Sequence, residues 1–162
     1  MKAVLESKKK EELLKKYTNI WEKASEEEKA DIFAFAESYK DFISYSKTER
    51  RAVGFALKLA KAKGYVDFSE KKTLKAGDKI YFINRDKNIV LYKIGKKGFD
   101  AGIRMLAAHL DAPRLDLKPN PLYEDAGIAL LDTHYYGGIK KYQWTAIPLA
   151  LYGVAYTQKG QR

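Results

Sequence analysis

The first third of the chain carries apolar residues at the three- and four-residue spacing of amphipathic helices. A first helical face is formed by Leu13, Tyr17, Ile20 and Trp21. A second helix is predicted to begin at Ser25, because Ser25 and Glu28 have the spacing of a capping box. Its aromatic residues, together with one just beyond its apolar stripe, are predicted to lie in the core: Phe33, Phe35, Tyr39, Phe42 and Tyr45.

A third helix is predicted from a second capping box, formed by Ser46 and Glu49. Apolar residues at helical spacing follow it as far as Ala60. Gly64 is expected to end the helix, because glycine adopts the left-handed backbone of a helix terminus without a steric penalty.

After Gly64 the hydrophobic period changes to that of β-strands. Lys79–Ile83 and Ile89–Ile94 predict a hairpin, and the nearly unbroken apolar run Ile103–His109 predicts a strand buried on both faces. Gly127–Tyr136 and Trp144–Tyr156 predict two more strands. Turns are expected at 96–98 and 158–160, and an extended or turning segment at Pro113, Pro119 and Pro121. The predicted fold class is α/β, with N-terminal helices followed by a mixed β-sheet.

Composition narrows the class of protein. The chain has 162 residues, no cysteine and a net charge of +10. The absence of cysteine excludes thiolate metal sites and cysteine nucleophiles. Basic residues exceed acidic ones by 18 to 13 in residues 1–75 and by 13 to 8 in residues 76–162, so the excess is spread evenly. The one tight cluster, Lys8–Lys10, adjoins Glu11 and Glu12, which favours a solvated helix surface over a nucleic-acid site.

No membrane association is expected. The longest apolar run, Ala146–Ala155, contains Pro148 and Gly153 and is far shorter than the roughly 20 residues of a membrane span. The first six residues lack the apolar core of a secretion signal. The chain is therefore expected to be cytoplasmic.

The segment with most chemical information is Ala107–Lys118. His109 ends the predicted strand and Asp111 follows two positions later, so period-two geometry directs both side chains to one side. Metal sites use such a histidine and carboxylate pair, in which the carboxylate orients the imidazole. A structural alternative has His109 at a strand end and Asp111 beginning a turn before Pro113.

The spacing does not reveal a complete metal site. A catalytic zinc usually has three protein ligands. Other candidate ligands are His134, Asp116, Glu124, Asp125 and Asp132, and the acidic ones are explained equally well as turn and strand-edge residues. The Tyr135–Gly138 group most simply indicates a tight turn with packed aromatics, and alternatively the edge of a substrate entrance or a subunit contact.

The segment Ala107–Lys118, with Pro121–Asp125 and Thr133–Trp144, closely resembles the aspartyl aminopeptidase family of zinc metallopeptidases. The resemblance is dense from Gly102 to Gly153, and Ser44–Arg51 lies in a looser part of it. It implies an α/β catalytic domain with two zinc ions, interrupted by an inserted domain that mediates subunit contacts. Residues 1–122 would be the N-terminal part of the catalytic domain, and residues 123–162 the crossing into an incomplete inserted oligomerisation domain.

The resemblance also implies roles for particular residues. His109 matches a zinc ligand and Asp111 the carboxylate that orients it and supports catalysis. The family hydrolyses N-terminal Asp or Glu from peptides and its members form homo-oligomers. Arg114 is a candidate for reading the acidic side chain, although nothing in the sequence assigns it.

The family's remaining zinc ligands and its general base have no matching positions in these 162 residues. The chain, which ends just after a turn signal, is therefore expected to be an inactive N-terminal fragment of the enzyme. The alternatives are a non-catalytic assembly or binding module and, less favoured, a basic nucleic-acid-binding domain.

Overall fold

A computed structural model describes residue 14 and residues 17–160. The chain divides into two compact units, Met1–Asp41 and Phe42–Arg162. Lys8–Lys10 and Leu13 lie outside the described residues, so the solvated-surface interpretation and part of the first predicted helical face remain predictions. Within the described part of the chain, no helix has the length and apolar character required to cross a bilayer.

The first unit contains α2 (Ile20–Lys23) and most of α3 (Glu26–Tyr45). The capping box is confirmed: the Glu28 amide donates to Ser25 Oγ at 3.1 Å, and the Ser25 amide donates to the Glu28 carboxylate at 2.8 Å. The first predicted helix is wrong at Tyr17, which is not helical: among the described residues helical backbone begins at Ile20, where Asn19 caps it.

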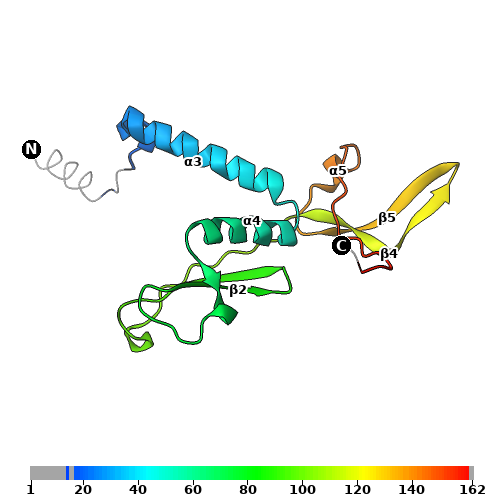
Figure 1. Cartoon of the computed structure of the whole chain (residues 1–162). Helices are drawn as coiled ribbons and strands as arrows, with labels where there is room; N and C mark the ends of the chain where they lie inside the picture. The colour runs from blue at the N-terminus through cyan, green and yellow to red at the C-terminus, as the bar shows by residue number, and fades with distance from the viewer. Residues whose placement is uncertain (1–13, 15–16, 161–162) are drawn as a thin grey trace, which may run out of the picture. The chain divides into compact units, whose positions relative to one another are not determined.

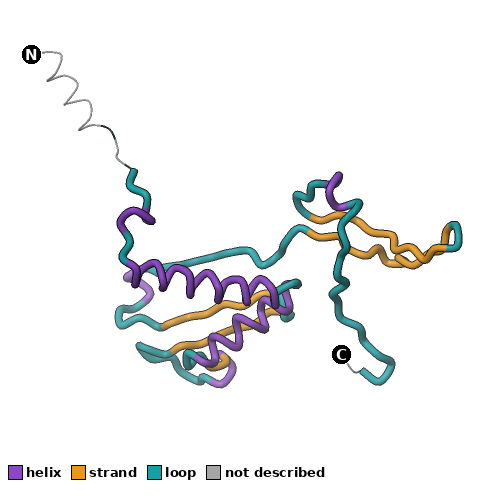
Figure 2. The backbone as a smooth tube through the Cα atoms, turned by 90° about the horizontal axis from the view of Figure 1, so that it is seen from above, coloured by secondary structure: helices purple, strands orange, loops and turns teal. Residues whose placement is uncertain are grey.

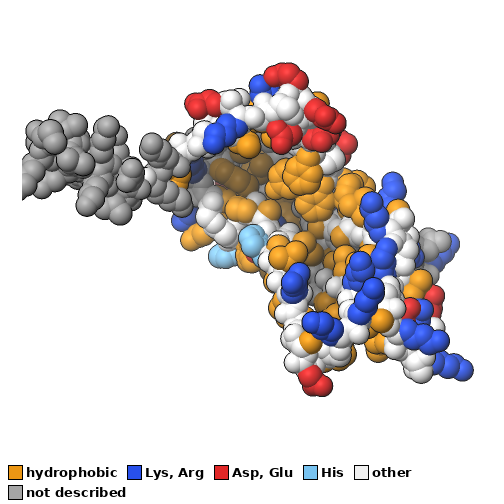
Figure 3. Space-filling view, turned by 90° about the vertical axis from the view of Figure 1, so that its left-hand side faces the viewer, with side chains coloured by type: hydrophobic (Ala, Val, Ile, Leu, Met, Phe, Trp, Pro, Cys, Tyr) orange, Lys and Arg blue, Asp and Glu red, His pale blue; other side chains and the backbone are white. Residues whose placement is uncertain are grey.

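The predicted aromatic core of α3 is wrong at four of its five residues. The exception is Phe42, which is half-buried with its ring edge-on to that of Phe55, 5.3 Å between ring centres. Phe33 and Phe35 are 62% and 74% exposed, and Tyr39 and Tyr45 are about half exposed. Helical spacing places these residues as predicted, but it does not by itself supply a surface to pack against. Figure 3 shows numerous hydrophobic side chains at the molecular surface.

The second unit is built on α4 (Glu49–Ala62) and a three-stranded sheet. The predicted hairpin is confirmed as antiparallel β2 (Lys79–Asn84) and β3 (Asn88–Lys93), and β1 (Val66–Asp67) adds a parallel strand beside β2. The sheet is therefore mixed, as predicted. Figure 1 shows α4 beside this sheet. Its small core contains Ala52, Val53 and Ala60 from α4 with Ile80 and Tyr81 from β2.

The start of α4 differs from the prediction. Thr48, not Ser46, is the N-cap, and its hydroxyl accepts a hydrogen bond from the Arg51 amide at 3.4 Å. Because the helix begins two residues later than the capping box requires, Glu49 does not return to the Ser46 amide and its carboxylate is available for other partners. The predicted end is confirmed: Gly64 has φ +79°, and the Tyr65 amide bonds to the Ala60 carbonyl at 3.0 Å.

The predicted strand Ile103–His109 is wrong in the described chain, where residues 102–113 form no strand. A strand requires a hydrogen-bonded neighbour, and none pairs with this segment among the described residues. Ile103 and Met105 are accordingly 62% and 78% exposed. The chain bends at residues 96–97, within the turn expected at 96–98, and then forms the 310 helix η2 (Phe99–Ala101). Figure 2 shows a long loop leading to a separate hairpin.

That second hairpin pairs β4 (Arg114–Asp125) with β5 (Ile128–Tyr136), which confirms the predicted strand ending at Tyr136. β4 fits the extended segment expected from its prolines. The register shifts between Leu117 and Leu122, where Pro119 and Pro121 lack the amide protons that a regular ladder needs.

The predicted strand Trp144–Tyr156 is wrong. Lys141–Trp144 forms the short helix α5, and residues 145–157 have no strand. Pro148 and Gly153 both weaken strand structure in this run. The turn at 158–160 is confirmed.

Substitutions at two glycines, Gly54 within α4 and Gly64 just after its end, test where this helix ends. Gly64→Ala should lower stability by about 1–2 kcal/mol, because a Cβ disfavours positive φ even though open space surrounds the position. Gly54→Ala, inside the exposed face of α4, should instead raise stability by up to about 1 kcal/mol. Urea unfolding midpoints measure both changes. Equal shifts of the same sign would contradict the assigned helix end.

Candidate functional site

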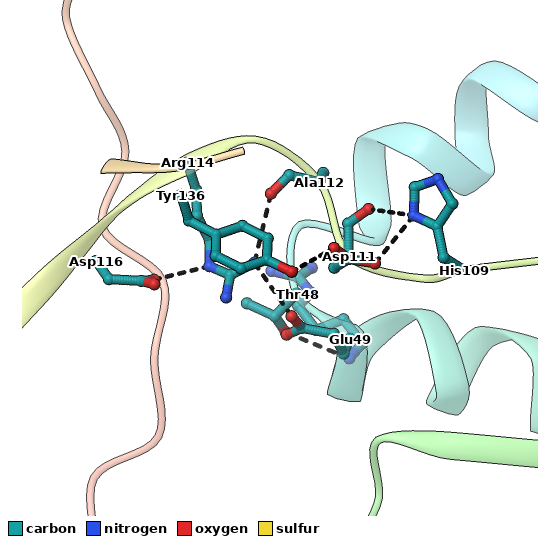
Figure 4. Close-up of polar contacts among 9 residues, drawn as sticks. Thr48, Glu49, His109, Asp111, Ala112, Arg114, Asp116 and Tyr136 are labelled. Carbon is teal, nitrogen blue, oxygen red and sulfur yellow. Dashed lines mark hydrogen bonds and ion pairs between the residues drawn. The ribbon is translucent and has the colours of Figure 1, made fainter. Parts of the chain in front are cut away.

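His109 and Asp111 lie in direct contact, as their spacing predicts, although no strand carries them. His109 Nδ1 lies 2.9 Å from Asp111 Oδ1 and 3.0 Å from the Asp111 backbone oxygen. Both oxygens can only accept when the carboxyl is ionised, so Nδ1 carries the proton. In the neutral imidazole Nε2 then holds the free lone pair, and this atom points away from Asp111 (Figure 4).

The imidazole is accessible to a ligand. The His109 side chain is 84% exposed and that of Asp111 is 36% exposed. An open pocket of about 250 Å³ adjoins them, lined by Glu49 of α4, by Lys87 and the first two residues of β3, and by residues 108–111. This arrangement replaces the predicted buried strand end with an exposed histidine beside a shallow pocket.

Tyr136, at the end of β5, is the second partner of Asp111. Its hydroxyl donates to Asp111 Oδ2 at 2.6 Å (Figure 4). The Tyr136 hydroxyl, the Asp111 amide and His109 all donate to this carboxylate and hold its pKa below the ordinary value. The same hydrogen bond, with the nearby negative charge, raises the pKa of Tyr136. Asp111 is thus an ionised acceptor with hydrogen-bond donors on both oxygens.

Arg114 connects this group to α4. Its Nε donates to Asp116 at 2.7 Å, and its terminal nitrogen lies 3.2 Å from Glu49. Its guanidinium carbon lies 4.1 Å from the centre of the Tyr136 ring. The hydrogen bond to Asp116 and the nearby acidic charges raise the pKa of Arg114. The Nε and Nη1 donors of Arg114 therefore have partners within the chain.

The other predicted ligand candidates contact residues other than His109. His134 stacks on Tyr135 with ring centres 5.4 Å apart, and Asp132 pairs with Lys118 at 3.0 Å. Glu124 accepts from the Gly127 amide at 2.8 Å, in the turn that joins β4 to β5. The turn interpretation of Glu124 is confirmed, and the ion pair of Asp132 is the behaviour of a strand-edge carboxylate. Asp125 closes the same turn, opposite Ile128.

No three His, Asp or Glu side chains converge on a possible metal position within residues 17–160. Toward a metal, this part of the chain offers the Nε2 atom of His109, because both oxygens of Asp111 accept hydrogen bonds from other residues. The metal role of His109 and the supporting role of Asp111 therefore stay predictions.

Sequence reasoning missed Glu49 and Tyr136 as members of this group. Glu49 was expected to close a capping box, and Tyr136 was interpreted as turn packing. The only signal for Tyr136 was its position beside Gly137 and Gly138, at the end of a predicted strand. Its contact with a residue 25 positions earlier is not encoded in any local pattern.

Comparisons with known proteins identify the family of this chain. The model of the family described as aminopeptidase I zinc metalloprotease (M18) matches residues 42–162. The probable M18 family aminopeptidase 1 of Clostridium acetobutylicum is 47% identical over 153 residues, which are 92% of this chain and 33% of that protein.

Solved structures give the same assignment. The M18 aminopeptidase of Thermotoga maritima has a TM-score of 0.82 and 38% identity, covering 91% of this chain and 32% of that one. Aminopeptidase I of Borrelia burgdorferi B31 has a TM-score of 0.76 and 46% identity, covering 78% and 31%. The chain spans about a third of the length of the curated relatives it matches. It belongs to the M18 family of zinc metallopeptidases, the aspartyl aminopeptidase family.

Proposed function

We propose that the protein carrying this chain is a cytoplasmic, homo-oligomeric aminopeptidase that removes N-terminal Asp or Glu from peptides at a two-zinc site. His109 is a zinc ligand through Nε2, and Asp111 orients it. The supporting observation is that two acceptor oxygens lie within 3.0 Å of His109 Nδ1, which favours the proton on Nδ1 and leaves Nε2 free for a metal. The family assignment supplies the class of metal.

Zinc held by His109 together with ligands from outside the described residues would supply Lewis acidity toward the scissile carbonyl and toward water. The described residues contribute the preparation for that chemistry. Asp111 stays ionised, fixes the tautomer of His109 and places negative charge behind the ligand. The open pocket at residues 108–111 leaves the outer ring edge accessible. The proposal requires further ligands and a general base from outside residues 17–160.

Arg114 is not proposed to read the substrate's acidic side chain. Its Nε and Nη1 atoms already contact Asp116 and Glu49, which hold the guanidinium within the chain. We propose a supporting role instead, in which Arg114 joins the start of β4 to α4. The division at residues 122 and 123 between catalytic and inserted domains is retained as part of the proposal.

The metal role of His109 has a matched control in the chain, because His134 is the only other histidine. In the full-length protein, His109→Ala should remove bound zinc and reduce hydrolysis by more than the roughly 10–100-fold typical of outer-shell changes. His134→Ala should retain both, since its ring stacks on Tyr135 away from the pocket. Zinc content is measured by elemental analysis. Full zinc occupancy in His109→Ala would remove this residue from the site.

The substrate class is tested separately. The full-length protein should hydrolyse an N-terminal aspartyl amide with a kcat/KM about 10- to 100-fold above that for the leucyl amide, the rate equivalent of one charge-assisted hydrogen bond. Raising the salt concentration should narrow the difference, because screening weakens charge recognition. Equal kcat/KM values for both substrates would reject acidic specificity while leaving the metal role intact.

A further inference from the structure

We propose that Tyr136 is a positioning residue of the metal site: its hydroxyl fixes the Asp111 carboxylate and, through it, the imidazole of His109. The inference rests on the proposed function, because it assigns a role toward the metal that His109 would bind. It extends the site to β5, an element that contributes no ligand.

The two oxygens of Asp111 have separate partners from different parts of the chain. Oδ1 faces His109 Nδ1 at 2.9 Å, and Oδ2 accepts from the Tyr136 hydroxyl at 2.6 Å. Rotation about the bond that carries a carboxylate is soft, so one hydrogen bond alone leaves the carboxylate plane free to turn. A second bond on the opposite oxygen fixes that plane, and with it the direction from which His109 is held.

The Tyr136 ring is itself held in place. Tyr136 and Arg114 are directly opposed in the register of β4 and β5, so both side chains lie on the same face of the hairpin. The guanidinium carbon of Arg114 lies 4.1 Å from the ring centre, and ion pairs with Asp116 and Glu49 anchor the guanidinium on both sides. Rotation of the Tyr136 side chain would therefore break the contact between its ring and the Arg114 guanidinium.

The backbone after Tyr136 is held as well. Gly137 has φ +73°, and a Cβ there would lie 3.3 Å from Pro113 Cα. A glycine is needed for both reasons, the left-handed backbone and the close approach. The end of β5 thus contacts the segment that follows Asp111. This contact fixes how close the Tyr136 hydroxyl lies to the Asp111 carboxylate.

Tyr136→Phe in the full-length protein removes the hydroxyl and keeps the ring under Arg114. Zinc affinity, measured by chelator competition, should fall by about 10–100-fold, the range of outer-shell substitutions. The kcat should fall while KM for the peptide stays close to wild type, and the visible spectrum of the cobalt-substituted protein should shift. Tyr135→Phe, one residue away on the other face of β5, should leave the zinc affinity, the kinetic constants and the cobalt spectrum unchanged.

A double-mutant cycle covers the case in which Tyr136→Phe also perturbs folding. If Tyr136 acts through Asp111, then adding Tyr136→Phe to Asp111→Asn should weaken zinc binding no further than Asp111→Asn alone. Additive losses, or wild-type zinc affinity and cobalt spectrum in Tyr136→Phe, would overturn the positioning role. Zinc retained by His109→Ala would instead remove His109 from the metal site, which is the part of the proposed function that this inference rests on.

Discussion

The rest of the site depends on the hydrogen bonds that the ionised carboxylate of Asp111 accepts. Each of its oxygens accepts from a different partner, His109 on one side and Tyr136 on the other. Arg114 then ties the Tyr136 ring to Glu49 at the start of α4. One charge therefore links a loop, a helix start and a strand end, although none of these groups is deeply buried. The order of the site comes from paired charges and directional hydrogen bonds.

The local features of the fold could be predicted from the sequence because short-range chemistry determines them. The Ser25 capping box, the Gly64 helix end and the β2–β3 hairpin each depend on neighbouring residues. Residues 103–109 show the limit. Their apolar run is typical of a buried strand, but strand structure also requires a partner, and no partner lies within the described residues. The exposed aromatic residues of α3 show the same limit for burial.

The site likewise contains residues that local sequence predicts and residues that it does not. His109 and Asp111 are two residues apart, so their spacing and the family resemblance were enough to predict the pair. Tyr136 lies 25 residues beyond Asp111, and its contribution depends on the register of the β4–β5 hairpin and the close approach at Gly137. Arg114 looked available for an anionic substrate in the sequence, whereas in the fold its cation balances the carboxylates around it. The spacing of residues along the chain does not indicate which residues distant in sequence become the partners of Tyr136 and Arg114.

The central claim is that Asp111 turns the His109 imidazole so that Nε2 faces the metal. An anomalous-scattering map of the full-length protein, recorded at the zinc absorption edge, tests it most directly. The account predicts a zinc peak within bonding distance of His109 Nε2, about 2.0–2.1 Å, with Nδ1 still on Asp111. A peak bonded to Nδ1, or zinc bound with His109 uninvolved, would contradict it.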